Sequence, residues 1–339
     1  MPVCDLELTF LVGRERAMTK EIHKTRLTER REFLLGVSGT IAASGMVVPA
    51  IVGAQDATPP AAAELLPTIP LGKHRVTRLI TGWNPIGGYS HQTLNASLHM
   101  LEYFTPERTF EFIAKCEVAG INTWQVDHTE KSVAVVRKLR EKGSKMQIIC
   151  LHAESGHVPL KTAAADLGPI AFVHHGRVAY SLFRTGKSQV VRDYVKKVHD
   201  LGLLAGVSIQ DPVDLKRITD EGWENEFFMT SFHNLSRPAE EQRRLFGTVA
   251  VGEPFFETDP PAMMAVMRQV AKPCLAYKIL SAGRVSLNAK AAPRAVEKRF
   301  KNAFDNIKPT DAVIVGMFPV YRDELSESVA FTRKYGAPA

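Results

Sequence analysis

The amino-acid sequence predicts a (β/α)8 TIM barrel, an eight-stranded parallel barrel surrounded by helices, as a single domain over residues 71–339. Three observations predict it: eight short apolar segments recur along the chain, amphipathic segments of helical period lie between them, and four of these end at glycine. Short apolar strands that alternate with helices favour a parallel sheet covered by helices. A doubly wound open sheet is the alternative arrangement of the same units.

The predicted strands are short, apolar and bounded by polar or glycine-containing turns, as buried parallel strands are. They are expected to supply the wall of the barrel. The eight segments are 78–83, 122–128, 145–152, 170–175, 204–210, 226–233, 274–280 and 312–318.

The segments between the strands have the start and stop signals of helices. In the first of them Thr105 is expected to cap the helix and Pro106 to occupy its first turn. Glycine ends four helices because it adopts the left-handed backbone that follows a helix at little cost. The helices that end at glycine are 105–120, 130–143, 187–202 and 212–222, and three more are predicted at 260–271, 293–307 and 323–336.

Residues 1–54 have the composition of an export signal. Arg30-Arg31 precedes a weakly apolar segment, diluted by glycine and broken by Pro49, and cleavage is expected after Ala54. Residues 30–34, Arg-Arg-x-Phe-Leu, resemble the twin-arginine signal, which implies that the twin-arginine machinery exports the folded precursor to the periplasm. The run is too broken for a stable membrane span, although an uncleaved anchor is the alternative.

Two further boundaries follow from composition. Residues 1–17 precede an already complete basic region and are expected to be an over-extended start, and residues 55–70 form a Pro/Ala-rich linker. The net charge of +7 is scattered, with no run of like charges, so neither nucleic acid nor an anionic membrane is favoured as a partner. Cys116, Cys150 and Cys274 lie in or beside apolar segments and are expected to be buried thiols.

Histidines and carboxylates follow the predicted strands where a TIM barrel carries its chemistry. Five of the eleven histidines fall within one residue of four predicted strand ends. Neutral imidazoles and carboxylates on converging loops suit a divalent metal or acid–base catalysis, whereas each histidine alone equally suits packing. We predict His152 and His174 as base and acid or as ligands, with metal ligands drawn from Asp127, His128, Glu154 and His233.

Two basic residues follow the seventh predicted strand. Lys278 is the only lysine in the interior of a predicted strand, where it is expected to act as an electrostatic stabiliser or, if desolvated, to form a Schiff base. An ion pair with a carboxylate is the structural alternative. Arg284 follows a Ser-Ala-Gly turn and is a candidate for holding an anion together with backbone amides.

Three stretches resemble the aldo-keto reductases. They are "IPLGKHRVTRLITGWNPIGG" at 69–88, "AGINTWQVDH" at 119–128 and "AVIVGMFPVYRDELSES" at 312–328. The resemblance spans almost the whole mature chain and implies a short hairpin at the barrel floor, a nicotinamide cofactor such as NADP, and carbonyl reduction by an Asp, Tyr, Lys and His tetrad. It also implies a cofactor-phosphate site, to which Arg284 and Arg322 are assigned.

The tetrad positions differ from the family pattern. Gln125 falls where the aspartate belongs, Glu130 where the tyrosine belongs, and Leu151 or His152 where the lysine belongs, so that only His174 is retained. The scaffold is therefore expected to support a different chemistry, because the usual proton donor and the group that lowers its pKa are both missing.

Three functions remain open. The first is an exported enzyme that uses histidine and carboxylate groups, with or without a divalent metal, as an isomerase, lyase or hydrolase on a small sugar-like or hydroxylated substrate. The second is an NADP-dependent oxidoreductase of aldo-keto reductase type. The third is a non-catalytic barrel that binds a sugar or a partner protein, for which the candidate residues are Trp83, Tyr89 and Phe104.

Overall fold

The computed structural model describes residues 64–286 and 291–337. The predicted signal and most of the linker lie outside these residues. Among the described residues, 154–157 fall outside the barrel unit, which all the other described residues form. No helix in the described part of the chain has both the length and the apolar character needed to cross a bilayer.

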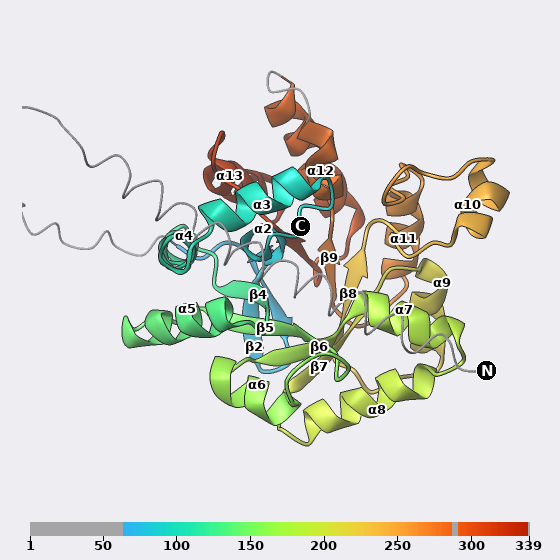
Figure 1. Cartoon of the computed structure of the whole chain (residues 1–339), viewed down its shortest axis with the longest axis horizontal. Helices are drawn as coiled ribbons and strands as arrows, with labels where there is room; N and C mark the ends of the chain where they lie inside the picture. The colour runs from blue at the N-terminus through green and yellow to red at the C-terminus, as the bar shows by residue number, and fades with distance from the viewer. Residues whose placement is uncertain (1–63, 287–290, 338–339) are drawn as a thin grey trace, which may run out of the picture. The chain divides into compact units, whose positions relative to one another are not determined.

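The barrel unit is a closed ring of eight parallel strands (Figure 1). This confirms the predicted (β/α)8 fold and excludes the open sheet, because the last strand, β10, pairs with both the first barrel strand, β3, and with β9. All eight predicted strands are present. They are β3 (Leu79–Thr81), β4 (Thr123–Asp127), β5 (Gln147–His152), β6 (Ala171–His174), β7 (Leu204–Ile209), β8 (Phe227–Ser231), β9 (Cys274–Tyr277) and β10 (Ala312–Val315).

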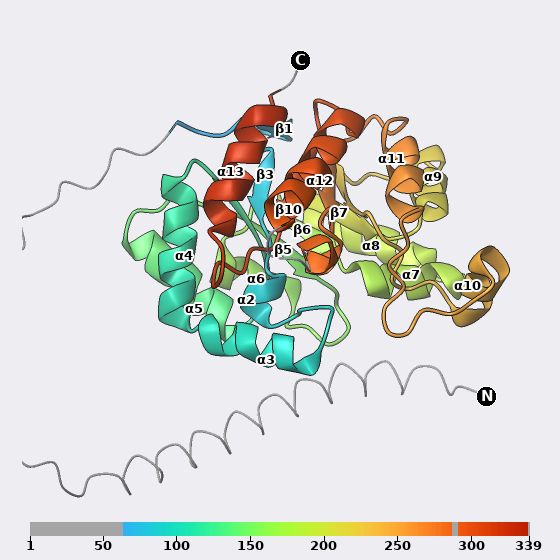
Figure 2. The same ribbon diagram turned by 90° about the horizontal axis from the view of Figure 1, so that it is seen from above.

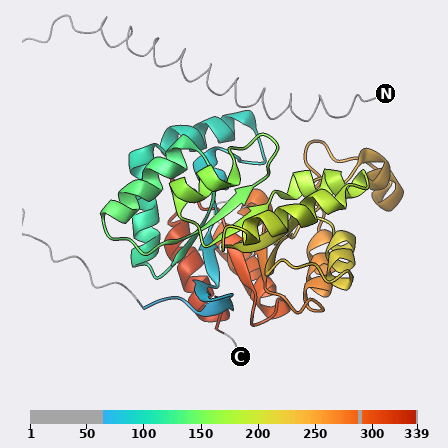
Figure 3. The same ribbon diagram turned by 90° about the horizontal axis from the view of Figure 1, so that it is seen from below.

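The predicted helices surround the strands, as Figures 2 and 3 show from opposite sides. The Thr105 side chain caps the first, accepting from the Arg108 backbone N–H at 3.3 Å. The glycines predicted to end four helices all have left-handed φ angles, between 62° and 95°. The seven predicted helices are α4 (Pro106–Val118), α5 (Glu130–Glu141), α8 (Ser188–His199), α9 (Pro212–Asp220), α11 (Asp259–Met267), α12 (Ala292–Asn306) and α13 (Glu324–Tyr335).

Five α-helices and one 3-10 helix were not predicted, and most of them lie in the loops that follow strands. They are short or have a mixed pattern, so their periodicity is weak in the sequence. Helix α10 lies far from the strands in Figures 1 and 2. The unpredicted elements are α2 (Asn84–Gly87), α3 (Leu94–Tyr103), α6 (Leu160–Leu167), α7 (Gly176–Arg184), α10 (Ala239–Phe246) and the 3-10 helix η1 (Ser281–Ser286).

A two-stranded hairpin precedes the barrel, as the family resemblance implied. Strands β1 (Thr68–Leu71) and β2 (His74–Thr77) pair antiparallel, and their residues Ile69, Leu71 and Val76 join the apolar cluster of the barrel interior. The structure places residues 68–70, which the sequence assigned to the linker, in β1. The prolines of this stretch hide the apolar residues that the hairpin buries.

Two apolar clusters stabilise the barrel unit. The smaller one fills the interior, and the larger one lies between the strands and the helices and contains Cys116, Cys150 and Cys274. These three cysteines are free and buried, as predicted. Burying one large apolar side chain contributes about 1.5–3 kcal/mol, so the two clusters hold the strand ends, and the loops that follow them, in fixed positions.

Candidate functional site

The pleat of the strands decides which predicted site residues face the barrel interior. Ile149 and Leu151 of β5 pack in the interior cluster, whereas Cys150 between them packs in the outer one. Successive side chains of a strand point to opposite faces, so His152 points outward. The same alternation on β6 turns His174 outward.

His152 and His174 pack against helix α8 instead of lining the barrel mouth. The Tyr194 ring stacks on His152 with centroids 5.9 Å apart and meets His174 edge-on at 4.9 Å. Nε2 of His152 donates to the Val158 carbonyl at 2.8 Å, and both imidazoles are buried. The structure therefore places both imidazoles on the helical side of the strands, away from the barrel interior where we expected them. The sequence could not fix the register, and a shift of one residue reverses every side chain.

The predicted metal ligands are not gathered in the described structure. Nε2 of His128 lies 2.7 Å from Oδ2 of Asp166 on α6, and Nε2 of His233 lies 2.9 Å from Oγ of Ser281. Glu154 falls outside the barrel unit. Within residues 64–286 and 291–337, no group of three or more His, Cys, Asp and Glu side chains has an arrangement that holds a metal ion. The structure does not assemble the predicted set of Asp127, His128, Glu154 and His233.

Lys278 is a predicted site residue that lies at the barrel mouth. It follows the C-terminal residue of β9, is partly buried, and has a left-handed φ of 62°. Its Nζ lies 4.8 Å from the centroid of the Tyr277 ring and has no hydrogen bond or ion pair to any described residue. Burial lowers the pKa of the amine to about 8. Near pH 8, Lys278 therefore presents a substantial fraction of neutral, nucleophilic amine.

The lack of a hydrogen bond or ion pair to the described residues distinguishes Lys278 from Lys131, whose pKa burial also lowers to about 8. Lys131 donates to the carbonyls of Ile86 and Phe104, both at 2.8 Å, so its hydrogen bonds explain its position. Among the residues that the structure describes, no such hydrogen-bond partner explains the position of Lys278. A partly buried ammonium without an ion-pair partner is costly, and this cost favours the neutral amine at the mouth.

Glu253 and His91 form a carboxylate–imidazole pair beside Lys278. Oε2 of Glu253 lies 2.7 Å from Nδ1 of His91, and Nε2 of His91 lies 2.9 Å from the Asn84 amide nitrogen. Because the amide nitrogen is a donor, Nε2 of His91 accepts and Nδ1 donates to the carboxylate. Burial and the nearby charge of Lys278 lower the pKa of His91, so the ring is neutral. This is the arrangement of a general base oriented by a carboxylate.

Two arginines lie on the loops around this pair. Nη2 of Arg177, at the start of α7, lies 3.4 Å from Oε1 of Glu253. Arg284 donates to the His91 carbonyl at 2.7 Å, and its guanidinium lies 3.8 Å above the Phe255 ring. These charges act on Lys278 in opposite directions, because Glu253 raises the pKa of its amine and Arg177 lowers it. The mouth therefore carries an excess of positive charge around one carboxylate.

Backbone strain is concentrated in the same loops. Four non-glycine residues in the described part of the chain have left-handed φ angles: His91, Lys278, Ser281 and Ala282. The amide of Gln92 donates to the Ala282 carbonyl at 2.7 Å, which joins the loop after β3 to the loop after β9. Such conformations cost roughly 1–3 kcal/mol each and cluster at functional sites.

Tyr277 closes the top of the interior beneath Lys278. Its ring packs against the interior cluster, and its hydroxyl lies 3.1 Å from Oγ of Ser208 on β7. Burial raises the pKa of this phenol, so it stays protonated. A Cβ atom at Gly176 would lie 2.7 Å from Oγ of Ser208, and glycine at this position lets α7 begin directly over the two hydroxyls.

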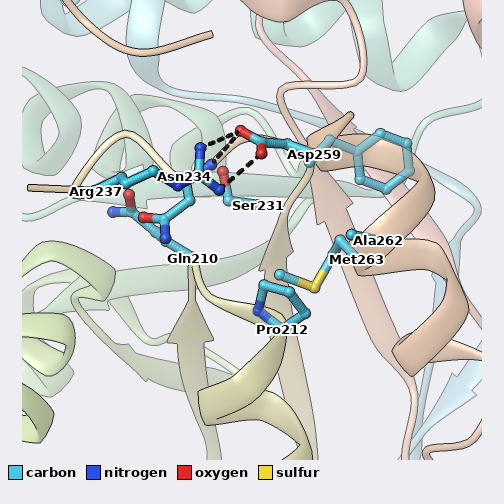
Figure 4. Close-up of a pocket in the computed structure, with 9 residues that line it drawn as sticks. Gln210, Pro212, Ser231, Asn234, Arg237, Asp259, Ala262 and Met263 are labelled. Carbon is cyan, nitrogen blue, oxygen red and sulfur yellow. Dashed lines mark hydrogen bonds and ion pairs between the residues drawn. The ribbon is translucent and has the colours of Figure 1, made fainter. Parts of the chain in front are cut away.

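An ion pair fixes the segment that carries Glu253, which lies between α10 and α11. Nη2 of Arg237 donates to Oδ1 of Asp259 at 2.8 Å beside a small pocket, and Figure 4 shows these two side chains reaching toward each other. The Arg237 guanidinium also lies 5.3 Å from the centroid of the Phe246 ring and 5.6 Å from that of Phe256. Arg237 precedes α10 and Asp259 begins α11, so this buried pair closes the loop of chain that carries Glu253.

The two arginines assigned to a cofactor phosphate have other partners. Arg322 forms an ion pair with Glu327, with its Nε 3.3 Å from Oε1, and Arg284 supports the backbone of His91. The tetrad positions of the family resemblance are equally altered: Gln125 is buried on β4 and Glu130 is exposed at the start of α5.

No protein-family model matches the chain, and no curated protein sequence matches it. Among solved structures, the chain is similar to the glycerol dehydrogenase AKR11B4 from Gluconobacter oxydans, with 13% identity over 80% of this chain and 97% of that chain and a TM-score of 0.45. It is also similar to Gox0644 in its apo form, with 14% identity over 81% of this chain and 97% of that chain, and a TM-score of 0.47. It is similar as well to an uncharacterized B. cereus protein, with 8% identity over 76% of this chain and 63% of that chain, and a TM-score of 0.42.

His233 provides a prediction about acid stability. Burial lowers its pKa to about 4, below the unfolded-state value near 6.5, so the folded protein resists protonation more than the unfolded chain does. Stability is therefore full above about pH 6.5 and falls, by about 3 kcal/mol for this group, as the pH drops toward 4. We expect His233→Gln to lose less stability than the native protein between about pH 7.5 and 4.5 in urea unfolding. The same change at His199, on the outer helix α8, is the control, and an equal loss in native protein and His233→Gln would contradict the prediction.

Proposed function

We propose that this protein is an enzyme that binds a small hydroxylated carbonyl compound at the barrel mouth and activates it through the amine of Lys278. The observation that carries the proposal is the amine itself: partly buried, without a hydrogen bond or ion pair to the described residues, and adjacent to the His91–Glu253 pair. An amine of this kind suits lyase or isomerase chemistry, two of the reaction classes expected from the sequence. In this proposal Lys278 takes the central catalytic role that the sequence analysis gave to His152 and His174.

The reaction balances with groups that the chain supplies. The neutral amine adds to the substrate carbonyl, and loss of water leaves a protonated imine, which withdraws electrons from the neighbouring carbon. The Asn84 amide, which donates to Nε2 of His91, gives way to the substrate, and Nε2 then accepts a proton. If the proton comes from the carbon next to the imine, an enamine forms and isomerisation or exchange follows. If it comes from a hydroxyl one carbon further, the carbon–carbon bond breaks, its electrons form the enamine, and the enzyme is a lyase.

The electrostatics of the mouth support these roles. Glu253 stabilises the imidazolium that forms when His91 takes the proton, as an orienting carboxylate does in other acid–base sites. The protonated Tyr277 hydroxyl, next to Ser208, offers a proton donor near the position where water leaves. The desolvation that lowers the pKa of Lys278 also favours the neutral amine that adds to a carbonyl.

Reductive trapping tests this function. The purified protein is incubated with hydroxyacetone and cyanoborohydride, which reduces imines to stable amines, and the modified peptides are located by mass spectrometry. We expect an adduct on Lys278 that forms faster than on any other lysine. Modification spread over exposed lysines, with none at Lys278, would overturn the proposal, and micromolar NADPH binding in its place would favour the oxidoreductase alternative.

We further propose that the protein is exported in folded form to the periplasm, because residues 30–34 match the core of a twin-arginine signal. We expect Arg30→Lys combined with Arg31→Lys to retain the precursor in the cytoplasm, whereas the native sequence yields a periplasmic protein that starts at residue 55. Fractionation and N-terminal sequencing measure this outcome. Unchanged export of the double variant would contradict it, and a mature chain that retains residues 1–17 would contradict the over-extended start.

A further inference from the structure

We propose that the substrate of this site is an anionic carbonyl compound, whose carboxylate or phosphate pairs with Arg177 while its carbonyl faces Lys278. The inference rests on the proposed function and adds the substrate class. It comes from the charges at the mouth, where the guanidinium groups of Arg177 and Arg284 and the amine of Lys278 all interact with the carboxylate of Glu253.

Glu253 is already committed to His91. Its Oε2 lies 2.7 Å from the imidazole, a strong contact, whereas its Oε1 lies 3.4 Å from Arg177, at the limit of a hydrogen bond. This weak contact is the only ion pair that Arg177 makes with the residues described by the structure. Most of the guanidinium donors are therefore available to a ligand.

Arg177 is placed to receive an anion. Its side chain is 63% exposed, and it is the second residue of α7, whose first residue, Gly176, lies directly over the hydroxyls of Ser208 and Tyr277. A guanidinium binds carboxylate or phosphate oxygens through two parallel hydrogen bonds. The positive charge of Arg177 also lowers the pKa of Lys278, so the same residue that attracts an anion keeps the amine neutral.

Arg284 contributes charge but not a free binding group. It is held by the His91 carbonyl at 2.7 Å and by the Phe255 ring beneath it. It therefore fixes the loop and adds to the positive potential, and the specific contact is assigned to Arg177.

Pairs of ligands that differ in charge test this inference. Pyruvate and hydroxyacetone share a carbonyl and differ in a carboxylate, and dihydroxyacetone phosphate and dihydroxyacetone differ in a phosphate. We expect cyanoborohydride to trap at least one anionic member about tenfold faster than its neutral counterpart. Arg177→Gln should abolish this preference, and Arg177→Lys should restore part of it.

The ratio within each pair isolates anion recognition. Arg177→Gln raises the pKa of Lys278 and so slows trapping of both members equally, which leaves the ratio to report the direct contact. Equal trapping of both members by the native protein, or a preference that survives in Arg177→Gln, would overturn the inference while leaving the lysine chemistry intact.

A binding measurement separates this inference from the proposed function. Lactate and propane-1,2-diol have no carbonyl and form no imine, so calorimetric titration reports the anion contact alone. We expect lactate to bind more tightly than the diol in the native protein and not in Arg177→Gln. If lactate is preferred but no ligand is trapped on Lys278, the lysine function fails and the anion site stands. If lactate shows no preference over the diol, the carboxylate version fails.

Discussion

Replacing Lys278 by methionine is expected to abolish imine trapping at the barrel mouth and to reduce exchange of the hydroxyacetone C–H protons with D2O by on the order of 10³-fold or more. The methionine side chain has similar length and no amine, so it removes the nucleophile and keeps the volume. Because the Lys278 amine has no hydrogen bond or ion pair to the described residues, the substitution should leave the thermal midpoint unchanged or raise it. Proton NMR and a thermal melt measure the two effects.

Lys131→Met is the matched control. Its amine has the same lowered pKa, about 8, but donates two hydrogen bonds to carbonyls. We expect this variant to lose about 1–3 kcal/mol of stability and to keep its exchange activity. We therefore expect Lys278→Met to be inactive and at least as stable as the native protein, and Lys131→Met to be active and less stable. An exchange rate in Lys278→Met equal to that of the native protein would contradict the lysine function. Loss of exchange activity in Lys131→Met as well would show that the loss in Lys278→Met is not specific to the amine at the barrel mouth.

The barrel could be predicted from the sequence because each strand is a short apolar run and many of the helices between them have a recognisable cap or glycine end. The positions of individual side chains at the mouth were less predictable. His152 and His174 lie at strand ends as expected, but the register places them against Tyr194. A hydrophobic pattern that is apolar on both faces, as in a parallel barrel, does not reveal which face is interior.

Glu253 and Arg177 were missed for a different reason. Both lie in parts of the chain where no helix or loop of defined geometry was predicted, and Glu253 is about 25 residues upstream of Lys278 in a long connection between β8 and β9. His91 was visible as a loop histidine, but its partner was not. Two signals would have pointed to the site: Gly252 next to Glu253, and the lysine at a strand end, which is rare unless its charge is used or paired.

Replacing Glu253 by glutamine should separate the two halves of the proposed mechanism. The negative charge of Glu253 raises the pKa of Lys278 from the value that burial alone would impose, and Arg177 opposes it. Without that charge, the Lys278 pKa falls below about 8, so the pH midpoint of imine trapping is expected to move to lower pH. His91 meanwhile loses the carboxylate that raises its own pKa and becomes a weaker base.

Deuterium exchange of hydroxyacetone should consequently fall by about 10²–10⁴-fold in Glu253→Gln, although the imine still forms. Trapping and exchange measured over the same pH range on one protein sample distinguish this result from unfolding, which would reduce both. Glu257→Gln is the control, because Glu257 lies on the same segment, pairs with Arg299 and interacts electrostatically with His233. A trapping midpoint in Glu253→Gln that stays in place or moves to higher pH would show that Glu253 does not set the charge of Lys278. Exchange that falls equally in Glu257→Gln would assign the effect to the segment as a whole instead of to the His91–Glu253 pair.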